Sequence, residues 1–209
     1  MTNKTRQTGD AKNIKVALFQ PALPKYRIPV FNALGASPGI ELTVLPSPKL
    51  AGSSLPQADG AETFEVVWAP MYRKGPFFRQ PGLHEELKPG RFDVVIFSWY
   101  TRNLDLGKAI RRARQLGMPV ALWGHGYSKN ESAWRTFLRN RQARRADALI
   151  FYNNTARDKL IKHSFRPETL FVAANTLDQG PIQAAREYWL QHPDELKRFQ
   201  QEHELENRP

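Results

Sequence analysis

The sequence has no cysteine, which excludes disulfide bonds, thiolate metal sites and catalysis by a thiol. It also has no run of about 18 apolar residues, so no membrane-spanning helix is predicted. The polar N-terminus lacks the apolar segment of a signal peptide. We therefore expect a cytoplasmic protein, either free or peripheral to the inner face of the membrane.

Phosphate-binding loops are missing too. The sequence contains neither the GxGxxG pattern of dinucleotide-binding folds nor the GxxxxGK[ST] loop of many nucleotide-binding proteins. It has no Cys/His cluster and no paired-histidine motif, so no metal site is expected. The GxSxG elbow of one large hydrolase class is also absent. From these absences we expect no bound metal and no other cofactor.

Acidic residues are few relative to basic ones. The 20 acidic residues are outnumbered by 31 lysines and arginines, which gives a net charge of +11. Such an excess favours an anionic partner, such as nucleic acid, a phosphorylated ligand or an acidic membrane surface. Aromatic residues interleaved with base-reading side chains are not evident, so nucleic acid is not expected as a partner.

Short apolar runs alternate with helical patterns along a chain that is 41% hydrophobic. The predicted strands are residues 15–20, 40–45, 64–69, 92–98, 119–123, 148–152 and 170–174, and the predicted helices of this part are residues 26–34, 104–116, 132–146 and 155–163. Such alternation indicates an α/β fold, a Rossmann-like parallel sheet of about six to seven strands with helices on both faces. Prolines interrupt residues 71–90, which are expected to be irregular apart from one helical turn at residues 83–87. Leu104 is expected to point inward.

The pattern divides the chain into three segments. Residues 1–13 are polar and unpatterned, and we expect them to be a flexible lead. Residues 14–178 contain all the predicted strands and are expected to form one domain. Residues 179–209 are predicted to form two helices, at 181–190 and 194–203.

The predicted helix 132–146 is rich in arginine and has Trp134, Phe137 and Leu138 near one side. We expect an ordinary surface helix, with its apolar side in the core and its basic side in solvent. The alternative is contact with an anionic membrane, which basic amphipathic helices also favour.

Open parallel sheets bind ligands beyond the carboxyl ends of their strands, and polar residues gather in the turns at these ends. His125 lies between Gly124 and Gly126, where glycine lets the backbone turn sharply and lets a ligand come close. An imidazole there suits a general base or a partner for a sugar hydroxyl. The other candidates for substrate binding are Lys25, Tyr26, Arg27, Tyr100, Arg102 and Asn153.

These residues also have structural interpretations, which the sequence leaves open. His125 would then be a turn histidine bonded to a neighbouring backbone group. Lys25 and Arg27 would be solvated charges. Trp99, directly after the strand at 92–98, would pack beneath the following helix.

Four segments occur in a distinctive order. They are FDVVI at residues 92–96, WGHG at 123–126, RADALI at 145–150 followed by Tyr152 and Asn153, and VAANTLD at 172–178. This order resembles the N-terminal domain of family 4 glycosyltransferases, which have the GT-B fold, over roughly residues 14–178. The sequence departs from the family in the first turn, which lacks glycine, and at Ala174 and Thr176, where proline and glycine are common.

The resemblance implies transfer of a sugar from a nucleotide-sugar donor to a glycan or lipid-linked acceptor, as in polysaccharide biosynthesis, without a metal. It implies that this domain binds the acceptor, and that residues 179–209 are a helical linker toward a C-terminal domain missing from this chain, which would be inactive alone. By position it implies a catalytic role near the reacting sugar for His125, acceptor contacts for Tyr26, Arg27, Tyr100 and Arg102, a place in the cleft for Asn153, and a boundary role for Asn175 and Asp178. The alternative is a non-enzymatic Rossmann-like module that binds a glycan, a lipid phosphate or a partner protein.

Overall fold

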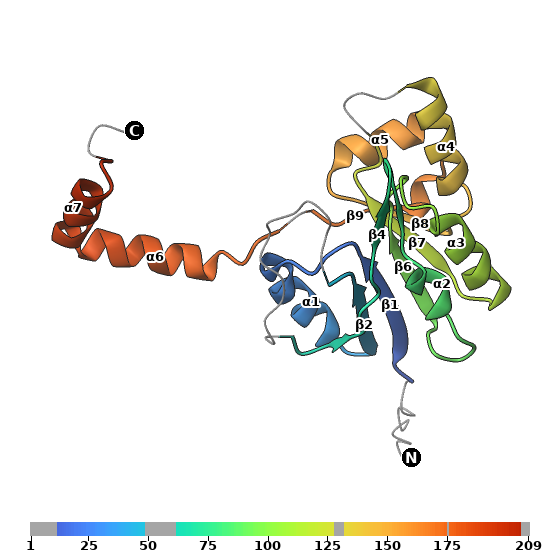
Figure 1. Cartoon of the computed structure of the whole chain (residues 1–209), viewed down its shortest axis with the longest axis horizontal. Coiled ribbons are helices and arrows are strands. Elements are labelled where there is room, and N and C mark those ends of the chain that lie inside the picture. Colours follow the sequence, from blue (N-terminus) through green and yellow to red (C-terminus); the bar gives the residue numbers. More distant parts are fainter. Residues whose placement is uncertain (1–11, 49–61, 128–131, 175, 206–209) are drawn as a thin grey trace, which may run out of the picture. The chain divides into compact units, whose positions relative to one another are not determined.

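The computed structural model describes residues 12–48, 62–127, 132–174 and 176–205. The chain forms two compact units, residues 1–175 and 176–209, whose elements are labelled in Figure 1. Most of the predicted flexible lead, residues 1–13, lies outside the described residues, and so does Asn175.

The first unit is built on a seven-stranded sheet with the order β3-β2-β1-β6-β7-β8-β9, in which every neighbouring pair is parallel. The strands are β1 (Ile14–Gln20), β2 (Ile40–Pro46), β3 (Glu65–Val66), β6 (Val94–Ser98), β7 (Val120–Gly124), β8 (Ala148–Phe151) and β9 (Leu170–Val172). The predicted α/β fold with a Rossmann-like parallel sheet is confirmed.

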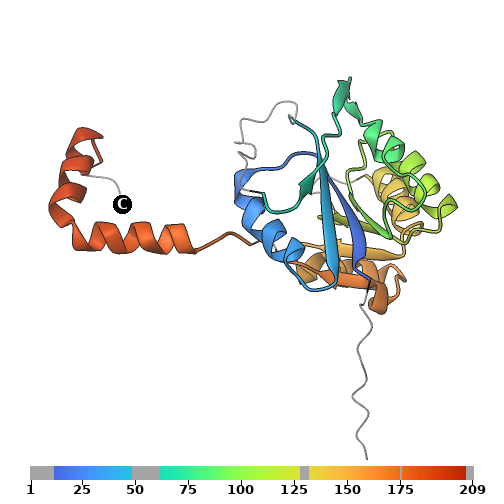
Figure 2. The same ribbon diagram turned by 90° about the horizontal axis from the view of Figure 1, so that it is seen from below.

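Helices lie on both faces of the sheet, as predicted. One face is covered by α1 (Ile28–Gly35), where Phe31 packs in a core with Leu18 and Val44. The other face has a larger core that includes Phe97. The elements on that side are α2 (Gly82–Glu85), α3 (Leu106–Gln115), α4 (Ala133–Ala143) and α5 (Asn154–Lys162). Figure 2 shows α1 on one side of the sheet and α2 with α3 on the other.

The predicted strand at residues 64–69 is regular only over β3, at the edge of the sheet. The chain nevertheless continues along β2, because the Val67 N–H donates to the Val44 carbonyl and the Ala69 N–H donates to that of Pro46. Both faces of β1 are apolar and its last five residues are buried, as the pattern of a central parallel strand predicts.

The prediction that residues 71–90 are irregular is wrong in part. They contain an unpredicted antiparallel hairpin, β4 (Tyr72–Lys74) and β5 (Phe77–Arg79). The short helix α2 that follows overlaps the helical turn predicted at residues 83–87. Gly75, at a φ of 60°, provides the left-handed backbone of the turn. Prolines marked the breaks in this segment, but the pairing of such short strands depends on the rest of the fold.

The hairpin also explains why Leu104 does not point inward. The Phe78 N–H donates to the Arg102 carbonyl, and the Leu104 N–H donates to the Phe78 carbonyl. Leu104 therefore lies in a backbone pairing before α3 begins, and 46% of it is exposed. The prediction that it faces the core is wrong.

The predicted orientation of the helix at 132–146 is also wrong. In α4 the side chains of Trp134, Phe137 and Leu138 are exposed, whereas Arg139 and Ala143 are buried. Helical periodicity places the three apolar residues on one side, but it does not say which side meets the sheet.

The second unit contains α6 (Gly180–Gln191) and α7 (Pro193–Glu202), which match the helices predicted there. The rings of Trp189 and Phe199 pack with their centroids 5.8 Å apart. Neither helix contains a buried residue. Within the described parts of the chain, we find no helix with the length and hydropathy to span a bilayer.

Candidate functional site

The site lies at the edge of the sheet where the parallel strands end. β1 ends at Gln20, β7 at Gly124 and β8 at Phe151. The segments that follow these strands therefore start at a common edge, which is where open α/β sheets bind their ligands. Among the predicted residues, the structure brings Arg27 and His125 together through Tyr152.

Arg27 is the centre of this group. It follows β1 in the short 3-10 helix η1 (Lys25–Arg27), and Pro29 fixes the first turn of α1 directly after it. Its Nη1 donates to Gln20 Oε1 at 2.9 Å, and its Nη2 donates to the Tyr152 hydroxyl at 3.0 Å. One side chain thus connects the end of β1 to the end of β8.

Aromatic rings surround the same guanidinium. Its carbon lies 5.4 Å from the ring centroid of Trp123, 5.6 Å from that of Tyr152 and 5.9 Å from that of Tyr26. Rings at these distances attract a cation through their negative faces. Arg27 is therefore held in place from several directions, which is not how a solvated surface charge behaves.

The surroundings keep Arg27 charged. Burial lowers the pKa of its guanidinium, but hydrogen bonding and charge interaction with Tyr152 and Tyr26 outweigh burial and raise the pKa overall. The half-buried cation is weakly screened by water, so its attraction for an anion is stronger than that of an exposed arginine.

His125 is exposed beside this group. Its ring packs against Tyr152, with the centroids 4.7 Å apart and the planes at 51°. The ring of Tyr152 in turn packs against that of Trp123, with the centroids 5.8 Å apart. The imidazole is thus positioned by an aromatic side chain and remains open to solvent on its other side.

The two glycines beside His125 are required by the protein's own packing. A Cβ on Gly124 would lie 3.0 Å from Trp99 Cβ, and one on Gly126 would lie 2.7 Å from a ring carbon of Phe151. Gly126 also has a φ of 72°, which side chains other than glycine rarely adopt. The predicted sharp turn is therefore present, and the close neighbours are Trp99 and Phe151.

Tyr100 and Arg102 have other contact partners than Arg27, which bonds to Gln20 and Tyr152. The Tyr100 ring packs on Phe78 of the hairpin at 5.2 Å, and the Arg102 guanidinium lies 5.8 Å from the Tyr100 centroid. Lys25 is exposed. Asn153 caps α5, because its Oδ1 accepts a hydrogen bond from the Ala156 N–H at 2.9 Å.

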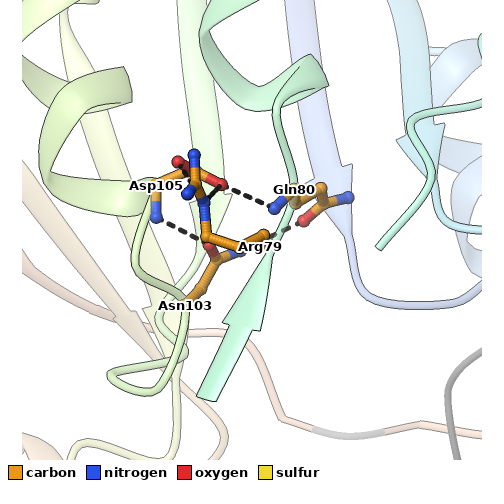
Figure 3. A network of polar contacts seen from close by, with 4 residues as sticks. All are labelled: Arg79, Gln80, Asn103 and Asp105. Atoms are coloured by element: carbon orange, nitrogen blue, oxygen red, sulfur yellow. Dashed lines mark hydrogen bonds and ion pairs between the residues drawn. The ribbon is translucent and has the colours of Figure 1, made fainter. Parts of the chain in front are cut away.

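A buried polar network holds the segment that carries Tyr100 and Arg102 (Figure 3). Arg79 Nε donates to both carboxylate oxygens of Asp105, at 2.8 and 3.0 Å, and the Gln80 N–H donates to one of them at 2.8 Å. Asn103 Nδ2 donates to Gln80 Oε1, and Asn103 Oδ1 accepts from the Asp105 N–H. The network fixes the hairpin to the loop after β6.

Sequence reasoning missed three residues of the site, namely Gln20, Trp123 and Tyr152. Each lies at or next to the end of a predicted strand, which was the one available signal. Gln20 Nε2 and Trp123 Nε1 are buried donors without a hydrogen-bond partner among the described residues. Buried donors of this kind are uncommon and mark positions where a polar partner is favoured.

The arrangement combines a fixed cation, aromatic faces and an exposed imidazole at one edge. Such a set suits a ligand with a sugar ring or an anionic group, because rings stack on aromatic faces and guanidinium binds phosphate or carboxylate. Within the described residues, no group of three or more His, Asp or Glu side chains has metal-binding geometry.

A family model described as Glycosyltransferase Family 4 matches residues 32–179. No curated protein sequence matches the chain significantly.

Several solved structures share the fold. A UDP-N-acetylglucosamine 2-epimerase superposes with a TM-score of 0.56 and 16% identity, over 78% of this chain and 49% of that one. Anabaena Alr3699/HepE in complex with UDP-glucose gives a TM-score of 0.53 and 13% identity, over 79% of this chain and 45% of that one. The chain thus spans about half the length of these proteins, and at such identities the likeness shows the fold alone.

Proposed function

This chain belongs to glycosyltransferase family 4, and we propose that it is the acceptor-binding half of an enzyme that transfers a sugar from a nucleotide-sugar donor. The acceptor would be a glycan or a lipid-linked glycan, as in polysaccharide biosynthesis. The fold supports this, since structural neighbours are a UDP-N-acetylglucosamine epimerase and a protein crystallised with UDP-glucose.

The observation that carries the proposal is the Arg27 group at the carboxyl edge. In it a cation is held by Gln20 and Tyr152, with Trp123 beneath it. We assign Arg27 to an anionic group of the acceptor and Tyr26 to a sugar ring, with Lys25, Tyr100 and Arg102 as further contacts. His125 would orient the reacting hydroxyl or accept its proton.

The nucleotide part of the donor is assigned to a second domain. The chain spans 49% of the epimerase and 45% of the Anabaena protein, and residues 179–209 would be the helical linker to that domain. Closure between two domains assembles such sites and excludes water. We therefore expect negligible sugar transfer by the 209-residue chain alone.

Acceptor binding tests the proposal directly. Titrations followed by NMR would compare an oligosaccharide linked to a lipid phosphate with the same oligosaccharide carrying a free reducing end. The phosphate-linked form should bind more tightly, and Arg27→Gln should weaken it by about tenfold or more, the loss of one hydrogen-bonded charge. Arg111→Gln, an exposed arginine on α3, is the matched control.

Two results would contradict the proposal. One is the absence of saturable binding for both forms of the oligosaccharide. The other is an equal loss of binding in Arg27→Gln and Arg111→Gln, which would reduce the interaction to general charge attraction.

A non-enzymatic binding module is the second candidate. It is favoured by the filled space at the glycine turn, where Trp99 and Phe151 occupy the approaches to Gly124 and Gly126. Extracts of cells with and without the gene would separate the two. Loss of one sugar-transfer activity supports the enzyme, whereas unchanged transfer with acceptor binding retained supports the module.

A further inference from the structure

Helix α4 turns an apolar face to solvent. The exposed fractions are 65% for Trp134, 54% for Phe137 and 39% for Leu138. The rings of Trp134 and Phe137 stack, with centroids 5.6 Å apart and planes at 23°. With Arg141 these residues occupy positions i, i+3, i+4 and i+7 of the helix, which share one side. We name this set the α4 outer face.

The opposite side of the helix fixes this orientation. Ala143 is only 2% exposed and belongs to the core beneath the sheet, and Arg139 is only 9% exposed. Ser132 caps the first turn by accepting from the Arg135 N–H. A surface helix normally buries its apolar stripe, so α4 is inverted, and the described residues of the first unit leave its outer face exposed.

The exposed charges of the helix are positive. Between Ser132 and Ala146 the sequence has no acidic residue, and Arg135, Arg141 and Arg144 are exposed. Arg141 lies within the outer face, and Arg144 is exposed just beyond the end of the helix. A solvent-facing apolar stripe with this composition complements an anionic surface that also has an apolar interior.

We propose that the α4 outer face docks on an anionic lipid bilayer. Trp and Phe sit well at the boundary between headgroups and acyl chains, and arginines bind the lipid phosphates. Nucleic acid would be attracted by the charge but would leave the three apolar side chains in water. An apolar patch on another protein would offer no anionic group to Arg141, which lies within the outer face.

The position of α4 in the fold gives this docking a consequence. α4 connects the carboxyl end of β7 to the amino end of β8, so its first turn, with Trp134, lies toward the edge of the sheet where His125 is found. A bilayer bound there would bring lipid-linked molecules toward that edge. The docking itself does not depend on sugar transfer.

Vesicle flotation with the whole chain tests the proposal. Vesicles of phosphatidylcholine alone would be compared with vesicles of equal parts phosphatidylcholine and phosphatidylglycerol. Binding is expected only to the second kind, and it should fall as salt is added. The double variant Trp134→Ser/Phe137→Ser should bind at least about tenfold more weakly, and Arg141→Gln about fivefold more weakly, the loss of one arginine at the surface.

Matched controls are available for both changes. Trp68 and Phe171 are exposed by 49% and 53% elsewhere on the same unit, and the double variant Trp68→Ser/Phe171→Ser should bind like the wild type. Arg111→Gln controls for the loss of one positive charge. Circular dichroism would show that every variant keeps the helical content of the wild type.

Three outcomes would overturn the proposal. These are no binding to anionic vesicles, equal losses in the α4 variants and their controls, or a concentration-dependent dimer abolished by Trp134→Ser/Phe137→Ser without vesicle binding. The last would assign the outer face to a second copy of the chain. Since no donor or acceptor is present, none of these outcomes bears on the proposed sugar transfer.

Discussion

Asp105 offers a prediction at the scale of single residues. Burial alone would raise the pKa of its carboxyl, but bonds from Arg79 and the Gln80 N–H outweigh burial and hold that pKa below the ordinary value of 3.8. Because the folded pKa is the lower one, the stabilisation is complete well above pH 3.8 and is lost as pH falls through the folded value.

Asp105→Asn should therefore lower the free energy of unfolding by about 1–3 kcal/mol at neutral pH. The difference between wild type and variant should shrink as pH falls below about 3.8. Urea denaturation at a series of pH values measures this difference in the free energy of unfolding. A difference that stays constant down to acid would mean that the carboxylate charge contributes nothing.

A pair of glycines gives a second prediction. Gly126→Ala should lower the free energy of unfolding by about 2–4 kcal/mol, because alanine is strained at a φ of 72° and its Cβ would overlap Phe151. Gly107→Ala should raise it by about 0.5–1 kcal/mol, because Gly107 is helical and a Cβ there meets nothing within 4 Å. Thermal denaturation of both variants would show shifts of opposite sign.

At this scale the sequence predicted the sheet edge on which the candidate residues lie, but not the contacts among them. His125 and Arg27 stand in turns after apolar strands, so their edge could be predicted from strand polarity alone. Gln20 and Tyr152 could not be identified as partners of Arg27, because 125 residues separate positions 27 and 152 and only the folded sheet brings them together.

Asn153 supplies the prediction that belongs to a single element. Its carboxamide caps α5, so Asn153→Ala should cost about 1 kcal/mol of stability. Asn153→Ser keeps a capping oxygen and should cost much less. If acceptor binding falls equally in both variants, the carboxamide also contacts the acceptor, and if it falls in neither, Asn153 serves only the helix.

The strands were predictable element by element, since β1, β6 and β7 each contain an apolar run of at least four residues. The hairpin was not, because β4 and β5 have only three residues each and Pro76 stands in their turn. The face of α4 was not predictable either. Burial of Arg139 instead of Phe137 depends on the neighbours of the helix, which periodicity does not contain.

For the molecule as a whole we predict one unfolding transition in the first unit. The two cores lie on opposite faces of the sheet but share β1, whose Leu18 faces one core and whose Phe19 faces the other. Loss of either core should therefore remove the other. With fluorotryptophan labels, the resonances of Trp99 and Trp123 should disappear at the same urea concentration, and separate midpoints would contradict this.

The strand order also affects how the chain folds during its synthesis. β1 lies inside the sheet between β2 and β6. Its pairing with β6 joins distant parts of the sequence, and just before β6 the Lys15 N–H donates to Asp93, 78 residues away. During synthesis β1 and β2 emerge first, and one edge of β1 stays unpaired until the ribosome has delivered β6. Unpaired edges invite aggregation, and distant pairings form slowly. A holding chaperone that covers this edge until β6 emerges should therefore raise the yield of native protein.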